Sequence, residues 1–340
     1  MGLIGRARGR LAHAAARARV RAGLRHVAGP RHLRLGPTEV ALVVVGRNAA
    51  FHLPDLVAHH RALGAGWLIY LDNGSTDGSV ELAAAIPDSV VATTPADFRR
   101  HEGLIRRAAV EAFATGGWRL VVDADEMFDY PGAARLPLPD LVARLEARGH
   151  GAMVAQMLDM VPPGPATGDL AASYRAARAA CRGYSLDDIT ARDYGDEAIG
   201  FAWFLRQNRP STPQVRVLFG GIRRTLFGED CCLTKHPLFR PGPGVVPLPH
   251  PHVSTGLAVT DATALIRHYK FSGDFVARER ALLAEGRVAH GETALRVAAL
   301  AADPGLRFDV PGLRQGPTPE GLLDAGFLVA TEGGRRMLGL

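Results

Sequence analysis

The chain has 340 residues, 47% of them hydrophobic, and carries a formal net charge of +6. This length and composition allow one large hydrophobic core or two smaller ones. No apolar run is long enough to cross a bilayer, and the three cysteines form neither a CxxC pair nor a disulfide framework. These features argue against a membrane-spanning protein and a disulfide-stapled secreted domain, and they favour a reducing cytosol.

The positive charge is concentrated at the N-terminus, where residues 1–34 hold nine arginines and no acidic residue. Subtracting these nine charges from the total leaves −3 for the rest, so we do not expect nucleic acid as a partner. The segment is rich in Ala and Arg, a composition compatible with a helix, but it lacks a clean apolar stripe, which favours a solvated, partly disordered extension. The alternative is peripheral contact with anionic lipid at the inner face of the plasma membrane, worth roughly 1 kcal/mol per Lys or Arg near the surface.

Residues 40–126 alternate between two kinds of pattern. Apolar runs rich in β-branched residues predict buried strands, and amphipathic stretches with an early Pro or a final Gly predict helices. The expected strands are 39–46, 67–72, 89–94 and 118–126, and the expected helices are 51–64, 79–86 and 101–117. Such a β-α-β-α-β-α-β order requires a parallel sheet with covered faces, in which ligands bind beyond the carboxyl ends of the strands.

The pattern weakens after residue 130. A Pro/Leu-rich linker precedes an expected helix at 140–148 and a strand at 151–160, and a short strand and a helix are expected within 264–286. We therefore predict an α/β fold with a mostly parallel, Rossmann-like sheet flanked by helices and an irregular C-terminal half. The expected divisions are a basic extension (1–38), the core (39–160), a half that completes the same domain (161–290) and a helical tail (291–340).

Three carboxylates crowd the end of the fourth expected strand, in the sequence WRLVVDADE. Residues two apart in a strand point the same way, so Asp123 and Asp125 face one site while Ala124 turns into the core. Two such carboxylates repel each other unless a cation or hydrogen-bond donors neutralise them. A divalent cation such as Mn²⁺ or Mg²⁺ does this and keeps room for phosphate oxygens. The pattern predicts a site for a metal and a diphosphate.

A second acid-rich tip, LDNGSTDGS, ends the second expected strand. The Asp72 carboxylate is an acceptor suited to the N–H and O–H donors of a nucleobase or a ribose. Gly74 and Gly78 allow a sharp turn, and Asp77 is placed to cap the next helix. An ordinary Asx-type turn is the alternative for this segment.

Two other enzyme classes share parts of this pattern. A phosphatase with the motif DxDx(T/S) needs a hydroxyl four places after its first Asp, where this chain has Met127. A nucleotidyltransferase would show a Gly-rich loop with Arg or Lys after its first strand, where VVVGRNAAFHLP has one Gly and one Arg. Both classes fit less well than a site for a nucleoside diphosphate.

Taken together, RNAAFHLPDLVAHHRALGAGWLIYLDNGSTDGS and VVDADEMF resemble the family-two glycosyltransferases of GT-A fold. The resemblance is to the branch with the motifs N-E-x-x-(F/Y)-L-x-E-W-x-x-H-H, D-N-x-S-x-D and D-x-D-E-F. It is firm over 40–130 and diffuse over 150–290, where GGIRR, LTKHPLFR and LIRHYKF are similar to short motifs. The chain departs from the branch at Ala49, where Glu is usual, and at Met127–Phe128, where Phe is commonest after DxDE.

The resemblance implies a metal-dependent hexosyltransferase that uses a nucleoside-diphosphate sugar, usually with inversion. Its acceptor would be a hydroxyl of a glycan, a lipid-linked or a small molecule, and surface-polysaccharide synthesis is the expected process. Asp72 would contact the base, Asp123 the ribose or the metal, and Asp125 the metal that bridges the diphosphate. The nucleotide-binding set implied is Val45, Arg47, Asn48, Asp72, Asn73, Ser75, Asp77, Asp123 and Ala124.

Two roles are less closely defined by the sequence. GT-A enzymes often add a late histidine to the metal shell, for which His252 and His268 are the candidates. An inverting transfer also needs a carboxylate that takes the acceptor proton. The candidates for this base are Asp159, Asp188 and Asp230. The non-enzyme alternative is a catalytically degenerate binding or scaffold protein, which the loss of Glu at position 49 supports and the intact DxD opposes.

Overall fold

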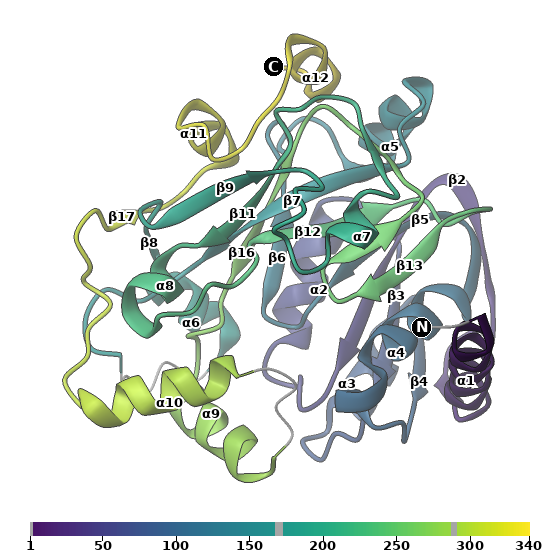
Figure 1. Ribbon diagram of the computed structural model, residues 1–340, viewed down its shortest axis with the longest axis horizontal. Coiled ribbons are helices and arrows are strands. Elements are labelled where there is room, and N and C mark those ends of the chain that lie inside the picture. The colour runs from purple at the N-terminus through teal and green to yellow at the C-terminus, as the bar shows by residue number, and fades with distance from the viewer. Residues whose placement is uncertain (1–2, 167–172, 287–290) are drawn as a thin grey trace.

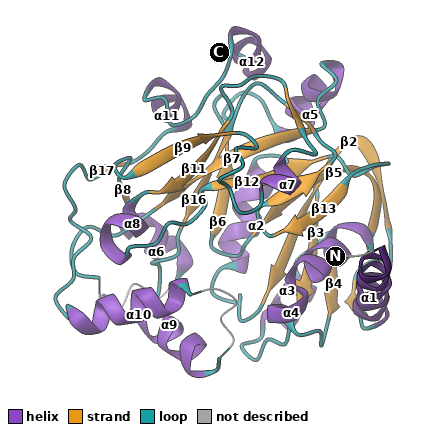
Figure 2. Ribbon diagram, viewed as in Figure 1, coloured by secondary structure: helices purple, strands orange, loops and turns teal. Residues whose placement is uncertain are grey.

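The computed structural model describes residues 3–166, 173–286 and 291–340, and one large mixed sheet lies at its centre (Figures 1 and 2). Its strands are β1 (Arg25–Ala28), β2 (Leu33–Gly46), β3 (Trp67–Asp72), β4 (Ser89–Thr93), β5 (Ala114–Val122), β6 (Glu126–Asp129), β7 (Ala152–Asp159), β10 (Arg209–Pro210), β12 (Thr234–Phe239), β15 (Ala258–Val259) and β16 (Ala264–His268). Their order is β1-β4-β3-β2-β5-β12-β7-β15-β10, and β16 joins β6 to β7.

Three two-stranded ribbons and a set of helices complete the described structure. The ribbons pair β9 (Ile189–Asp193) with β11 (Arg216–Gly220), β13 (Val246–His250) with β14 (Val253–Thr255), and β8 (Gly183–Tyr184) with β17 (Arg314–Gln315). The helices are α1 (Leu3–Ala22), α2 (Leu53–Ala62), α3 (Ser79–Ala85), α4 (Phe98–Glu111), α5 (Leu138–Ala147), α6 (Tyr174–Ala180), α7 (Ala202–Leu205), α8 (Ile222–Phe227), α9 (Phe275–Ala284), α10 (Glu292–Ala302), α11 (Pro319–Asp324) and α12 (Glu332–Leu338).

The N-terminal half confirms the predicted α/β class. Strands β4, β3, β2 and β5 are parallel neighbours, and side chains alternate across the sheet along β2. Val40, Leu42 and Val44 pack in one core with α2 and α5, whereas Ala41 and Val43 pack in a second core with α1 and α4. Helices therefore cover both faces, and the carboxyl ends of the four strands form one edge.

The segment before residue 39 is more ordered than its composition suggests. Helix α1 packs on α4, where Arg17 pairs with Glu111 at 2.8 Å and Val20 is buried. Strand β1 pairs antiparallel with β4. In place of a solvated, partly disordered extension, much of this segment adds a helix and an edge strand to the core, because its few apolar residues pack on a buried surface.

The paired glycines expected to end the third helix lie in a strand instead. Helix α4 ends at Glu111, and Gly116 and Gly117 belong to β5 with positive φ angles of 71° and 53°. A Cβ atom at Gly116 would lie 2.4 Å from the carbonyl oxygen of Leu35. The two glycines permit a close approach to β2, where the register of the β2–β5 pair shifts.

The C-terminal half closes the sheet with strands of both directions. Strand β12 inserts antiparallel between β5 and β7, and β16 lies parallel to β7 and antiparallel to β6. Helices α11 and α12 return to the same body, since Glu320 accepts a hydrogen bond from the backbone N–H of Gly132 and Arg144 donates to the carbonyl of Met337. The last helices of the chain thus pack against the segment that contains Gly132 and α5.

Candidate functional site

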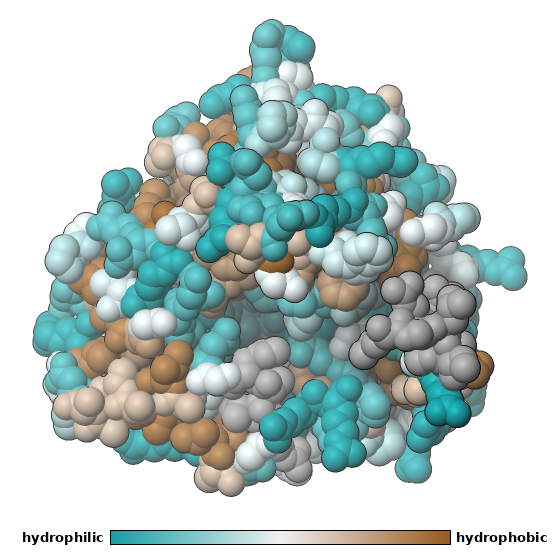
Figure 3. Space-filling view, in the orientation of Figure 1, coloured by the Kyte–Doolittle hydropathy of each residue, from teal (hydrophilic) through white to brown (hydrophobic). Residues whose placement is uncertain are grey.

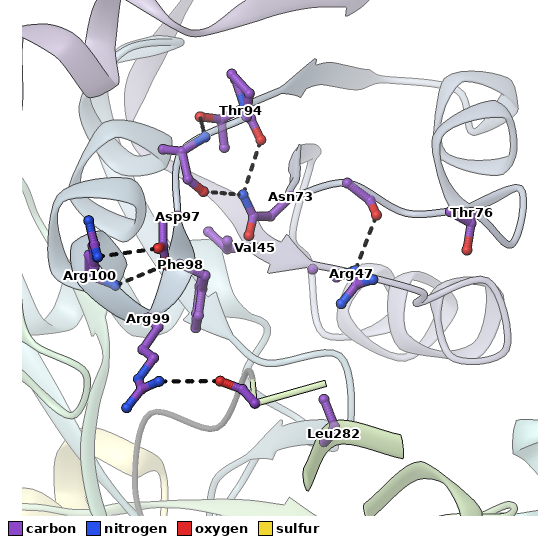
Figure 4. A pocket seen from close by; sticks show the side chains of 15 residues that line it. Val45, Arg47, Asn73, Thr76, Thr94, Asp97, Phe98, Arg99, Arg100 and Leu282 are labelled. Atoms are coloured by element: carbon purple, nitrogen blue, oxygen red, sulfur yellow. Dashed lines mark hydrogen bonds and ion pairs between the residues drawn. The ribbon is translucent and has the colours of Figure 1, made fainter. Parts of the chain in front are cut away.

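A cavity of about 1180 Å³ opens at the carboxyl ends of β2, β3 and β4 (Figure 4). The predicted residues Val45, Arg47 and Asn73 line it, together with the N-terminus of α4. Leu282 and Gly286, at the end of α9, form its far wall. The face seen in Figure 3 is hollowed near its centre, with apolar side chains of α9 and α10 at its lower left. The volume is large enough for a nucleotide-sized ligand.

Two loops at the mouth of this cavity hold each other in place. Asn48 has a positive φ of 54°, and its side-chain oxygen accepts from the backbone N–H of Thr76 at 2.9 Å. The backbone N–H of Asn48 donates to the Ser75 hydroxyl at 2.8 Å, and Asp77 accepts from the N–H of Ala50 at 3.0 Å. Asn48, Ser75 and Asp77 therefore shape the pocket by joining the loop after β2 to the loop after β3.

Asp72 is turned into its own loop. The residue is only 2% exposed, and its carboxylate accepts from the backbone N–H groups of Gly74 and Ser75 at 2.9 Å each. The Tyr70 hydroxyl donates to it at 3.2 Å, and the Ser75 hydroxyl also donates to it. These partners are those of an Asx-type turn, so in this structure the carboxylate does not face the cavity.

Asn73 and three arginines give the cavity its polar character. The Asn73 amide donates to the carbonyls of Thr94 and Ala96 at 3.0 and 2.8 Å, which ties the loop after β3 to the loop after β4. Arg47 pairs with Glu285 at 3.3 Å. Arg99 and Arg100, which sequence reasoning missed, come from the first turn of α4. Guanidinium groups and a helix N-terminus together favour an anionic ligand.

Arginine and lysine side chains of the protein itself neutralise the carboxylates that crowd the end of β5. Arg106, from α4, contacts one oxygen of Asp123 at 2.7 Å, and Lys235, from β12, contacts the other at 2.8 Å. Lys235 also pairs with Glu126. Burial alone would raise the pKa of Asp123, but Arg106 and Lys235 hold it well below its usual range. Asp123 is therefore ionised, and the charges of Arg106 and Lys235 balance its negative charge.

Asp125 belongs to a different set of contacts. His268, at the end of β16, places its Nε2 atom 3.4 Å from an Asp125 oxygen and its Nδ1 atom 2.6 Å from Asp159. Arg223 pairs with the other oxygen of Asp159 at 2.8 Å. Burial alone would lower the pKa of His268, but the charge of Asp125 and the hydrogen bonds to both carboxylates raise it to about 9. A chain of alternating charges thus runs inward from Asp125.

The residues near Asp125 fit a divalent cation better than those near Asp123. The Asp123 and Asp125 side chains are similarly exposed, at 28% and 23%, but Asp125 has an imidazole nitrogen beside its carboxylate, which is a common donor pair for a metal. The second nitrogen of His268 is held by Asp159, as the outer nitrogen of a metal-bound histidine usually is. Both Asp123 oxygens are occupied by cations. Among the described residues, no group of three or more His, Cys, Asp or Glu side chains is arranged to hold a metal ion.

The other predicted site residues lie in separate surroundings. Ala124 packs partly buried against the core, as expected, and His252 places its Nδ1 atom 3.2 Å from the carbonyl of Thr234. Asp188 accepts from the Thr225 hydroxyl at 2.6 Å, and Asp230 pairs with Arg224. Ion pairing lowers the pKa of Asp159 to about 2 against the effect of its burial.

The fold and the cavity define an α/β protein with a Rossmann-like, mostly parallel sheet and an anion-suited pocket beyond its carboxyl edge. No protein-family model and no curated protein matches the sequence. In the part of the chain that the structure describes, no helix combines the length and apolar character that a bilayer crossing requires.

Solved structures of S. aureus TarS show a partial similarity. TarS itself is 16% identical over 40% of this chain and 26% of TarS, with a TM-score of 0.30. Residues 1–349 of TarS in complex with UDP are 17% identical over 36% of this chain and 35% of that chain, with a TM-score of 0.28. A second structure of the same TarS fragment is 17% identical over 40% of this chain and 43% of that chain, with a TM-score of 0.27. The match spans less than half of each TarS chain.

Proposed function

We propose that the protein is a metal-dependent glycosyltransferase that moves a sugar from a nucleoside-diphosphate sugar to an acceptor hydroxyl. The observation that carries this proposal is the placement of two features on one sheet edge. An arginine-bearing cavity lies beyond β2, β3 and β4, and the Asp125–His268 pair lies at the end of the adjacent β5. A donor with its nucleotide in the cavity would direct its diphosphate toward the acidic tip.

The residues have distinct roles in this proposal. Arg47 and Arg99 would bind the phosphates, because both side chains line the cavity. Arg47 now contacts Glu285 and the carbonyl of Gly74, and Arg99 contacts the carbonyl of Gly286. Asp125 and His268 would hold Mn²⁺ or Mg²⁺, which offsets charge on a leaving diphosphate. Binding would displace the Nε2 proton of His268 to solvent, because only a neutral imidazole is a metal ligand. Asp123 keeps Arg106 and Lys235 beside that position. Inversion and the family-two assignment rest on the sequence resemblance.

The acceptor proton requires a carboxylate that is exposed enough for an acceptor hydroxyl to reach it. Asp159 acts through His268 as a positioning residue, since both of its oxygens are engaged. Asp188 and Asp230 remain the proposed bases, each on an exposed part of the acceptor-side half. A glycan, a lipid-linked or a small-molecule hydroxyl remains the proposed acceptor, with surface-polysaccharide synthesis as the process.

A thermal-shift panel tests this function directly. UDP-, GDP-, CDP- and dTDP-sugars would each be added with Mn²⁺, Mg²⁺ or EDTA. A ligand at about 100 times its dissociation constant adds roughly 2.7 kcal/mol to the free energy of unfolding, which is easily seen. Stabilisation by one nucleotide that requires metal would support the proposal. An unchanged unfolding temperature with every nucleotide sugar would overturn it.

A further inference from the structure

Helix α1 carries exposed arginines whose charge is not balanced by described carboxylates. Arg8, Arg19 and Arg21 have exposed side chains, and none of them forms an ion pair with a described residue. Arg17, which faces α4, pairs with Glu111 instead. Residues 1–34 contain no acidic side chain that could balance these charges within the segment. Such a set of exposed, unbalanced positive charges is suited to binding an anionic partner.

The basic character extends past the end of α1 and includes apolar side chains. Arg25 and Arg31 are also exposed, and residues 1–34 contain no carboxylate at all. Leu11 is 71% exposed and Val27 is 46% exposed. We call Arg8, Arg19, Arg21, Arg25 and Arg31 with these two apolar residues the basic surface. Cationic heads with apolar side chains among them suit the headgroup region of a bilayer.

The basic surface adjoins the rim of the proposed nucleotide cavity. A groove of about 290 Å³ is lined on one side by Arg19 and Val20 of α1 and on the other by the segment 94–97 with Arg100. Residues 94–97 and Arg100 also line the nucleotide cavity. Figure 1 shows α1 at the right edge of the molecule, beside α4 and β4. One wall therefore separates the cavity from α1.

We propose that the basic surface docks the protein on an anionic lipid bilayer, with the rim of the cavity beside the membrane. A bilayer is favoured over nucleic acid because the rest of the chain carries a net charge of −3 and because exposed Leu11 and Val27 gain from an apolar interface. Docking depends on α1 and the residues that follow it. It does not depend on the proposed activity.

Co-sedimentation with lipid vesicles tests the docking. The full chain would be mixed with vesicles of phosphatidylcholine alone and with vesicles that also contain phosphatidylglycerol. We expect binding only to the anionic vesicles, and binding that weakens as salt is added. The variant Arg8→Gln/Arg19→Gln/Arg21→Gln should bind far more weakly, by about fivefold for each arginine removed. The thermal-shift response to nucleotide sugars should stay unchanged in this variant.

A matched variant tests whether vesicle binding depends on the basic surface or only on the net charge of the protein. Arg307→Gln/Arg335→Gln/Arg336→Gln removes the same charge from exposed positions away from α1 and should bind anionic vesicles as the unmodified chain does. Equal loss in both triple variants, or no binding of the unmodified chain to anionic vesicles, would overturn the proposal. Binding to a DNA duplex in preference to vesicles, lost in the α1 variant, would assign the surface to nucleic acid and equally overturn it.

Discussion

Three aspartates at the sheet edge show how surroundings decide the role of one side-chain type. Asp72 is enclosed by donors of its own turn, and Asp123 is held between Arg106 and Lys235. Asp125 faces His268 and keeps partial exposure. The sequence predicted all three as ligand-binding, and we propose Asp125 for the metal because it faces an imidazole, whereas both Asp123 oxygens are held by cations.

Replacement of Asp125 by alanine should abolish metal-dependent donor binding and leave the fold intact. The change removes the proposed metal oxygen and one of the two carboxylates that pair with His268, while Asp159 keeps its contact with that ring. Calorimetric titration of Mn²⁺ with the nucleotide sugar present would measure the loss. Asp123→Asn is the matched control, and we expect it to lower stability because it weakens two ion pairs. Unchanged Mn²⁺ affinity in Asp125→Ala would contradict the proposed site.

His52 offers a test of buried polarity beside the same site. Its two ring nitrogens are buried without a hydrogen-bond partner among the described residues, and its ring packs against Tyr174 at 4.6 Å between centroids. Burial lowers its pKa to about 4, so the ring is neutral near pH 7. His52→Phe should raise the free energy of unfolding by about 1 kcal/mol, because unsatisfied buried polar atoms are costly.

Chemical denaturation of two histidine variants would measure this effect. His60 is also buried, but both of its nitrogens are satisfied, by the carbonyl of Leu56 and the N–H of Phe128. His60→Phe should therefore destabilise the protein. A loss of stability in His52→Phe as large as in His60→Phe would show that the His52 nitrogens have partners in solution.

At the scale of elements, β12 joins the two halves of the molecule electrostatically. It places Lys235 between Asp123 and Glu126, which lie more than 100 positions earlier in the chain. Lys235→Met should lower the free energy of unfolding by about 3–5 kcal/mol, because removing one member of a buried pair leaves the other charge uncompensated. Urea unfolding would measure it. Arg240→Met, which disturbs a half-exposed pair with Glu146, should cost under about 1 kcal/mol.

The elements of the N-terminal half were predictable from local pattern. The strand at 67–72 was placed at its observed bounds, and the helix expected at 79–86 ends one residue earlier. The glycines at 116–117 were misassigned because a local pattern does not distinguish a helix stop from a bulge that needs a close neighbouring strand. The position of β12 was not predictable, since its pairing joins segments over 100 residues apart.

The candidate site was predictable to the same extent. The positions of the two acidic tips could be predicted because strand ends and side-chain alternation are visible in the local sequence. The neutralisation of the DADE tip by Arg106 and Lys235 could not be predicted, because neither residue stands at a characteristic sequence distance from that motif. His268 was singled out as one of two late histidines, and the pairing of β16 with β7 places it opposite Asp159. Arg99 and Arg100 lie in the sequence shortly after an expected strand end, and this position could have identified them as residues of the cavity.

At the scale of the whole molecule, stability should depend on pH through His268. Its folded pKa of about 9 lies above the ordinary value of 6.5. Protonation therefore stabilises the fold fully below pH 6.5, and this stabilisation is lost as the pH rises through 9. The loss should be on the order of 3 kcal/mol. Urea unfolding in EDTA across this range would measure it, and His268→Gln should flatten the profile. A flat profile in the unmodified protein would contradict the assignment.

The pairing of β1 with β4 has a consequence for the handling of the protein. Strand β1 covers the outer edge of β4, whose sequence SVVAT is short, apolar and without charge. A chain that starts at residue 33 would expose the hydrogen-bonding groups of β4, and open strands of this kind join to one another. We expect such a truncated chain to self-associate through β4, and light scattering against the full chain would detect it. The arginine-rich N-terminal segment thus protects the sheet from aggregation.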